Sequence, residues 1–208
     1  MSERPTEPFG LRSQLRVAAM REVQKAALDL FDSEGYGNVT IERIAGVAGV
    51  SPSSIYRYFG TKEMLVVWDD YETHAIDMVR EACRHAAGLE ELIGTAKLAA
   101  PLLSAAILSG DESFIKRRMK LINAEDEIRA GHLRVIQRLE GRLREPIAEC
   151  LHLDPFGLTI RLIVAQVIWS FVAALDCWVD GSFAEPLQDL LTEALDRVLT
   201  GISAQLDS

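Results

Sequence analysis

The spacing of apolar residues predicts helices along almost the whole chain. Val23, Ala27, Leu30 and Phe31 recur at intervals of three and four, which places them on one face of a helix over residues 11–34. The alternation of apolar and polar residues that marks strands is missing. We therefore expect an all-α fold of about nine helices.

Turn and capping residues divide the first part of this pattern into short helices. The glycines of 35-GYGN-38 end the first helix, and Thr40 is placed to cap a second helix that ends at Gly49. Ser51 is placed to cap a third helix of about two turns, which Gly60 ends. Two short helices joined by a tight turn form a helix-turn-helix, so residues 40–59 are the expected motif.

Longer helices are expected over the rest of the chain. Thr61 is placed to cap a long helix from residue 62 to about residue 87. Further helices are predicted over residues 88–110, 111–124, 125–151, 154–179 and 185–206.

The last two helices carry the most apolar surface. The run 162-LIVAQVIWSFVAAL-175 is shorter than the roughly 20 residues of a membrane span, which favours a buried helix. The last helix has a full apolar stripe, and the two helices together carry more apolar surface than one subunit readily covers. We therefore predict a homodimer, and the alternative is that both helices pack inside one subunit. The predicted interface residues are Leu187, Leu191, Leu195 and Val198.

Composition places the chain among soluble globular proteins. Of its 208 residues, 49% are apolar and 25% are charged. The polar start lacks the apolar core of a signal peptide, and the three widely spaced cysteines suggest buried thiols in a reducing cytoplasm. We therefore expect a cytoplasmic protein.

The net charge of −9 is unevenly spread. Up to Glu63 the chain has eight basic and eight acidic residues, so the later residues carry the whole negative charge. An acidic protein binds nucleic acid poorly because phosphate affinity comes from lysine and arginine. That objection applies only to the C-terminal part, and the neutral N-terminal part can still carry a locally positive face.

The third helix carries chemistry suited to DNA. Ile55 and Phe59 are four residues apart and point inward, which leaves hydroxyl, phenol and guanidinium groups on the other faces. A helix of this size fits a major groove, where serine and arginine can reach base edges and phenols can bond phosphates. These candidate residues are Ser53, Ser54, Tyr56, Arg57 and Tyr58.

The segment 40-TIERIAGVAGVSPSSIYRYFGTKEML-65 resembles the DNA-binding signature of the tetracycline-repressor (TetR) family. The matching parts are the Ile-Ala pair, Ala-Gly-Val-Ser, Tyr-x-x-Phe and Lys-Glu-x-Leu, and the preceding helix matches as well. The resemblance covers residues 14–66, about a quarter of the chain. Gly46 departs from it, because the family has a better helix former at this position.

This resemblance implies a two-domain regulator. Residues 11–61 would form the DNA-binding domain, and residues 62–208 a helical domain for ligand binding and dimerisation. Thr40, Tyr56 and Lys62 would contact phosphates, Ser51 would cap the recognition helix, and its other polar residues would approach bases or backbone. Arg12 and Arg16 either reach the DNA from the side or belong to a solvated helix end.

The expected function is a DNA-binding transcriptional regulator released from its operator by a small, mostly apolar effector. Repression is the commoner role that the family implies, with activation as an alternative. The long helix from Lys62 would connect the two domains as a lever. A further alternative is a helical ligand-binding or protein-interaction module without regulatory DNA binding.

Candidate effector contacts are the aromatic, sulfur-containing and polar residues of the later helices. Gln166 lies deep in an apolar helix and bonds either a ligand or a neighbouring helix, and methionines or aromatics at helical spacing also occur in ordinary cores. The candidates are Trp68, Tyr71, Met78, Met119, His132, Gln166 and Trp169.

An enzymatic role has little support in the sequence. Cys83 and His85 are two residues apart and point to different sides of a helix. The sequence has no metal-ligand spacing, phosphate-binding loop or nucleophile elbow, so no cofactor and no metal are expected.

Overall fold

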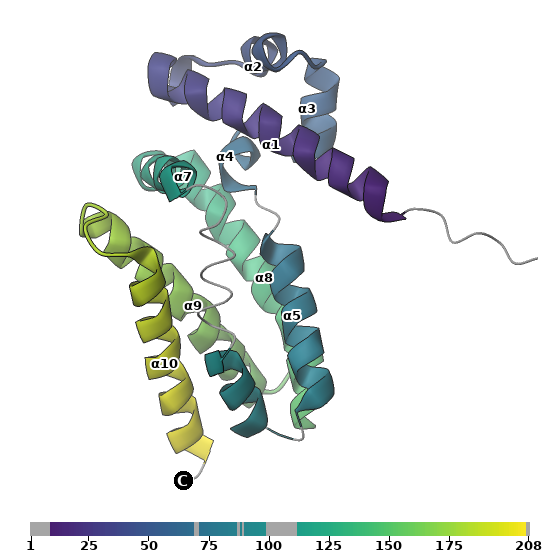
Figure 1. Cartoon of the computed structure of the whole chain (residues 1–208), viewed down its shortest axis with the longest axis vertical. Helices are drawn as coiled ribbons and strands as arrows, with labels where there is room; N and C mark the ends of the chain where they lie inside the picture. Colours follow the sequence, from purple (N-terminus) through teal and green to yellow (C-terminus); the bar gives the residue numbers. More distant parts are fainter. Residues whose placement is uncertain (1–8, 69–70, 87, 89, 99–111, 207–208) are drawn as a thin grey trace, which may run out of the picture. The chain divides into compact units, whose positions relative to one another are not determined.

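The computed structural model is all-helical in the part of the chain that it describes. It describes residues 9–68, 71–86, 88, 90–98 and 112–206, with side chains except at 9–13, 71–75 and 203–206. The chain forms two compact units, Met1–Asp70 and Tyr71–Ser208, and each is considered by itself (Figure 1). The described residues contain ten α-helices, one more than predicted, because residues 62–87 form two helices instead of one.

The N-terminal unit is built around one long helix. Its elements are α1 (Phe9–Glu34), the 3-10 turn η1 (Tyr36–Asn38), α2 (Ile41–Ala48), α3 (Pro52–Phe59) and α4 (Met64–Val67). The apolar face predicted for the first helix is buried, with Val23, Ala27 and Phe31 almost fully covered. Ile44 of α2 and Ile55 of α3 are also buried, with α2 packed against α1 and α3 packed against α2.

The long helix predicted from residue 62 is interrupted. The short α4 ends at Val67, because the ψ of 134° at the following Trp68 leaves the helical range, and α5 (Tyr71–His85) begins afterwards. The buried Gln24 amide donates to the Trp68 carbonyl over 2.7 Å, and the indole packs edge-on against Phe59 at 5.8 Å. These tertiary contacts outweigh helix propensity. The predicted cap at Thr61 is also wrong, because Glu63 precedes α4 in a helical conformation without a capping hydrogen bond.

The C-terminal unit is a bundle of longer helices. They are α5, the helix of residues 90–98, α7 (Glu112–Ala124), α8 (Asp126–Leu151), α9 (Leu158–Asp180) and α10 (Leu187–Leu206). Of the helix predicted over residues 88–110, the structure describes residues 88 and 90–98. The start of α9 comes later than predicted, because the Asp154 side chain and carbonyl accept the backbone N–H groups of Phe156 and Gly157 in a separate turn.

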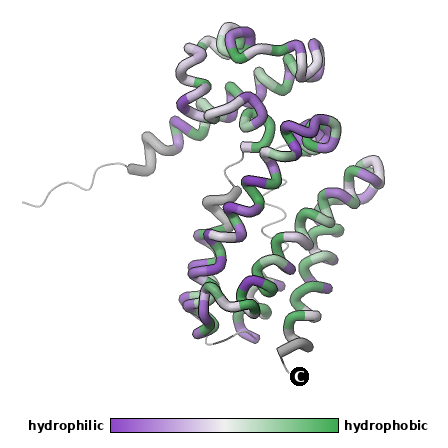
Figure 2. Tube along the Cα trace, turned by 180° about the vertical axis from the view of Figure 1, so that it is seen from behind, coloured by the Kyte–Doolittle hydropathy of each residue, from purple (hydrophilic) through white to green (hydrophobic). Residues whose placement is uncertain are grey.

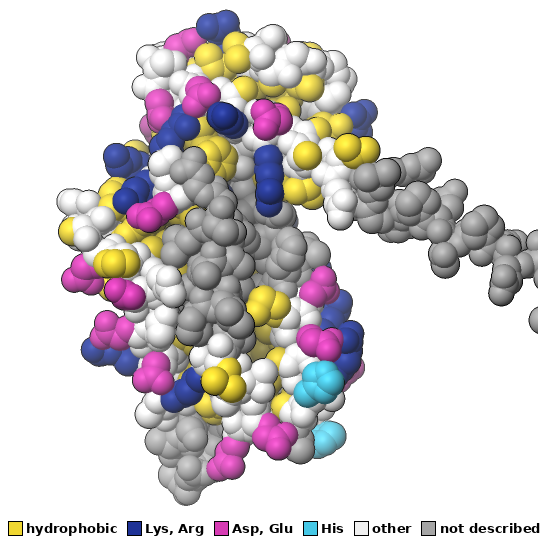
Figure 3. All heavy atoms as spheres, in the orientation of Figure 1, with side chains coloured by type: hydrophobic (Ala, Val, Ile, Leu, Met, Phe, Trp, Pro, Cys, Tyr) yellow, Lys and Arg dark blue, Asp and Glu magenta, His cyan; other side chains and the backbone are white. Residues whose placement is uncertain are grey.

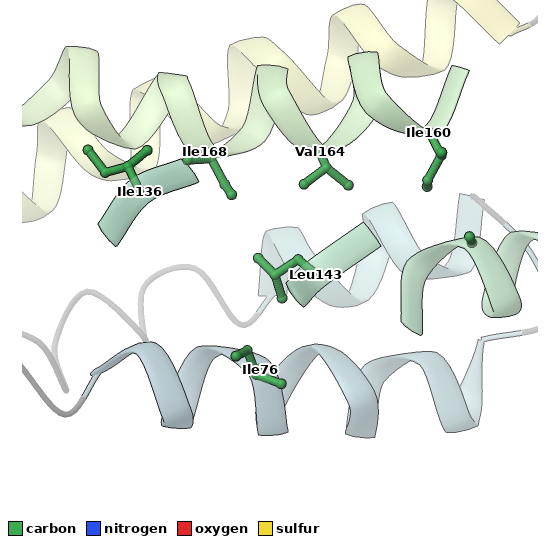
Figure 4. Close-up of a cluster of buried hydrophobic side chains, with 7 residues drawn as sticks. Ile76, Ile136, Leu143, Ile160, Val164 and Ile168 are labelled. Carbon is green, nitrogen blue, oxygen red and sulfur yellow. The ribbon is translucent and has the colours of Figure 1, made fainter. Parts of the chain in front are cut away.

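Two apolar clusters hold this bundle together. In the first, Ile76 of α5 and Leu143 of α8 face Val164 and its neighbours on α9 (Figure 4). In the second, Ile163 of α9 packs with Leu195 of α10 and with the helix of residues 90–98. Helix α9 therefore contributes to both clusters and lies at the centre of the packing.

Even so, α9 keeps a large uncovered apolar face. It is coloured as hydrophobic over most of its length in Figure 2, yet only 28% of its most apolar window is buried. Leu158, Leu162 and Trp169 are 72%, 48% and 41% exposed. By length and composition alone α9 could cross a membrane, but this is weak support because soluble core helices pass the same criteria. Helix α9, which the sequence predicted to be buried, is therefore buried over only part of its surface.

Candidate nucleic-acid interface

The turn between α2 and α3 is specified by residues at its ends. Thr40 accepts a hydrogen bond from the Arg43 backbone N–H over 3.2 Å and so caps α2. Gly49 has a φ of 66° in the left-handed region, which glycine adopts without the strain of a Cβ. The predicted helix-turn-helix is therefore present, with the caps and stops that the sequence indicated.

A cluster of serines forms the start of α3. The Ser51 hydroxyl accepts from the Ser54 backbone N–H at 3.2 Å, which confirms its capping role. The same oxygen lies 2.9 Å from the hydroxyls of both Ser53 and Ser54. These bonds orient the hydroxyls at a helix start whose free N–H groups favour an anion.

Aromatic and basic side chains extend this surface along α3. Tyr56 is 51% exposed, whereas Ile55 and Phe59 of the same helix are buried. The Arg57 guanidinium lies 5.1 Å from the Tyr58 ring centre, and Arg16 of α1 lies 5.8 Å from the same centre. Arg16 thus joins the α3 surface, whereas the Arg12 side chain lies outside the described residues.

The Lys62 side chain is bonded within the protein and does not extend freely into solvent. Its ammonium donates to the carbonyls of Tyr36 and Val39 over 2.8 and 3.1 Å and lies 4.0 Å from the Tyr36 ring centre. Sequence reasoning missed this fastening between the end of α3 and η1. An ammonium has three N–H groups, so these two bonds still leave one for a phosphate.

The seven candidate effector residues differ in their burial and in the unit to which they belong. Trp68 belongs to the N-terminal unit, and the side chain of Tyr71 lies outside the described residues. Met119 is buried, Met78 and Trp169 are exposed, and the remaining two are half-buried: His132 and Gln166. A cavity of about 480 Å³ between the ends of α5 and α8 is lined by none of the seven.

Comparison with known proteins explains the combination of elements. Residues 24–67 match the model of the tetR family of bacterial regulatory proteins, and residues 98–203 match the MftR C-terminal domain. The second match covers half of the chain. The chain belongs to the TetR family of bacterial transcriptional regulators. It is a DNA-binding regulator with an MftR-type C-terminal domain, from a family of soluble non-enzymes that bind DNA operators and small ligands.

Three relatives illustrate the likeness. The mycofactocin biosynthesis regulator MftR of Mycobacterium tuberculosis is 25% identical, over 92% of this chain and 93% of its own. The structure of FadR from Bacillus subtilis with stearoyl-CoA has a TM-score of 0.54 at 20% identity, covering 87% of this chain and 98% of FadR. The structure of SmeT from Stenotrophomonas maltophilia with triclosan has a TM-score of 0.55 at 16% identity, covering 88% and 91%. The two structural matches support the fold alone.

Proposed function

We propose that this regulator is a cytoplasmic repressor that leaves its operator when a small, mostly apolar effector binds the C-terminal unit. The observation that carries the proposal is the capped α3, with oriented hydroxyls, an exposed phenol and guanidinium groups on one surface. This surface has the groups that bond phosphates and base edges. The C-terminal helices then supply the ligand-dependent half, as in the family.

The DNA contacts are proposed residue by residue. Tyr56 and Thr40 bond phosphates and fix the register, while Ser53, Ser54 and Arg57 approach base edges or backbone. Tyr58, held by two arginines, and Lys62 support the same surface.

A variant of Tyr56 tests this assignment. Tyr56→Phe removes one phenolic hydroxyl, so we expect operator affinity to fall about fivefold to tenfold without a change in unfolding temperature. Thr192→Val, which removes a hydroxyl from α10 of the C-terminal unit, is the control. Unchanged affinity in both Tyr56→Phe and Tyr56→Ala would remove Tyr56 from the interface.

The effector class is proposed from composition and from the relatives. The described core of the C-terminal unit is aliphatic, and the ligands named for FadR and SmeT, stearoyl-CoA and triclosan, both carry large apolar parts. We would titrate the preformed operator complex with stearoyl-CoA, free CoA, triclosan and a planar cationic dye. Release by an apolar compound but not by free CoA supports the proposal, and release by the planar cation alone contradicts it.

We also propose a homodimer through α9 and α10. Helix α9 exposes an apolar face that includes Leu162 and Trp169. A second copy of the chain would cover this face with the same surface, as in a two-fold symmetric dimer. Three of the interface residues predicted from sequence are buried within the chain: Leu187, Leu191 and Leu195. Val198 is partly buried and packs against the cluster that contains Leu195. These four residues would therefore hold α10 within its own subunit, and the partner subunit would contact the exposed side chains of α9.

Light scattering tests the dimer. Trp169→Glu places a charge at the centre of the exposed face, so we expect the mass to fall from that of a dimer to that of a monomer at micromolar concentration. Leu133→Glu, on the exposed face of α8, is the control and should remain dimeric. A monomeric wild type would contradict the proposal. In a dimer, two α3 helices about 34–36 Å apart would enter successive major grooves, and an effector that favours another spacing would release the DNA.

A further inference from the structure

The C-terminal unit has a cavity that the proposed regulatory cycle does not use. It measures about 480 Å³, opens to solvent and lies between the C-terminal ends of α5 and α8. Figure 3 shows histidine, basic and acidic side chains together over the lower end of this unit. The polar groups that line the cavity are Arg80, Cys83, Arg84, Glu149, Cys150 and His152.

Two of these groups are neighbouring thiols from different helices. Cys83 belongs to α5 and Cys150 to α8, both line the cavity, and Cys150 is near enough to help raise the pKa of the Cys83 thiol. Both are half-buried and reachable through the cavity, whereas Cys177 is exposed on α9. The apolar cluster around Ile76 and Leu143 packs α5 against α8 and so keeps the two cysteines together.

We propose that Cys83 and Cys150 form a reversible dithiol–disulfide site that reacts with low-molecular-weight disulfides entering the cavity. One thiolate attacks the small disulfide and forms a mixed disulfide, releasing the first small thiol. The other cysteine attacks the protein sulfur of that bond, releasing the second small thiol. The two cysteines lose two electrons and two protons, and the small disulfide gains both.

The surroundings give the two cysteines different roles. Burial, followed by the hydrogen bond and the negative charge of Cys150, raises the pKa of Cys83 to about 12. Cys83 is therefore a thiol at neutral pH, and Cys150 is the first nucleophile. Capping Cys150 removes its charge, but burial still holds the pKa of Cys83 high, so Cys83 acts as the resolving thiol in the slower second step.

Closing the site would link the ends of α5 and α8. The disulfide would close a loop from residue 83 to residue 150, and a loop of this length restricts the unfolded chain strongly. We expect the unfolding temperature of the oxidised protein to rise by roughly 10 °C.

Thiol counting on the full chain tests the proposal without any substitution. The purified, reduced protein is incubated with oxidised glutathione, and its free thiols are counted in denaturant. We expect the count to fall from three to one, with peptides containing Cys83 and Cys150 joined, and to return to three with dithiothreitol. In Cys177→Ser the same link should form. A count that stays at three, or a link through Cys177 between chains, would overturn the proposal.

Single substitutions test the order of reaction. Cys83→Ser should keep one glutathione on Cys150, and Cys150→Ser should be modified at Cys83 at least tenfold more slowly. Circular dichroism checks that each variant is folded. Equal modification of the two variants, or a glutathione that remains on the wild type without closure, would contradict the proposed roles.

Discussion

Replacing Lys62 by methionine separates a structural role from a DNA contact. The change keeps most of the aliphatic stem and removes the ammonium that bonds the Tyr36 and Val39 carbonyls. Hydrogen bonds to a charged group each contribute about 1.5–3 kcal/mol, and a cation–π contact adds about 0.5–1 kcal/mol. Because one half-buried ammonium makes all three contacts, its desolvation offsets part of this sum, and we expect a loss of about 2–4 kcal/mol in the N-terminal unit.

Hydrogen exchange of the full chain measures this loss of stability at the segment that Lys62 contacts. The backbone N–H groups of Asn38 and Val39 are hydrogen-bonded within η1, the segment that Lys62 fastens. A loss of about 2–4 kcal/mol should speed exchange of peptides over residues 36–40 by about 30- to 900-fold. Peptides of α8 should exchange as in the wild type.

Lys25→Met is the matched control, because Lys25 is exposed on α1. Exchange within twofold of the wild type in Lys62→Met would refute the fastening role. If Lys62 also bonds a phosphate, the slope of log affinity against log salt should become shallower by about 0.9 for each subunit that binds the DNA.

Three further substitutions test the helix ends and one carboxyl group. Gly49→Ala should destabilise the protein by about 1–2 kcal/mol, because the φ of Gly49 is positive. Gly46→Ala should stabilise it by about 1 kcal/mol, because the added Cβ would lie in open space. Thermal unfolding distinguishes the two variants. Ser51→Ala should lower stability by about 1 kcal/mol through loss of the cap, and Ser51→Asp should restore it. Partial desolvation, and next the negative charge of Asp180, raise the pKa of the exposed Asp176, and the charge of Arg129 opposes them. The folded state therefore holds that proton more tightly, and the associated stability is lost as the pH rises through the raised pKa. Asp176→Asn should therefore unfold at a higher temperature than the wild type at neutral pH, and the difference should vanish in acid.

The N-terminal unit follows closely from local sequence signals. The cap hydrogen bonds at Thr40, Gly49 and Ser51 join residues that are three or four apart in the sequence. Capping and turn rules therefore predict the ends of α2 and α3 directly. The interruption at Trp68 depends on Gln24, which lies 44 residues earlier in the chain. A partner that distant leaves no mark on the local pattern, and the predicted long helix was wrong for that reason.

The C-terminal unit shows what periodicity leaves open. The stripe from Leu187 to Leu199 correctly predicted α10, but a stripe does not tell which surface covers it. The structure covers its leucines with α9 and the helix of residues 90–98, and the uncovered apolar face lies on α9. The pairing of Cys83 with Cys150 likewise needs the packing of α5 on α8, which spacing in sequence does not reveal.

Sequence-selective DNA binding is the most direct test of the whole account. Fluorescence anisotropy would follow the purified protein on DNA from upstream of its own gene and on unrelated DNA, at two salt concentrations. The account predicts tighter binding to the upstream DNA, with affinity that falls as salt rises. Equal binding to both DNAs, or affinity that does not respond to salt, would contradict it.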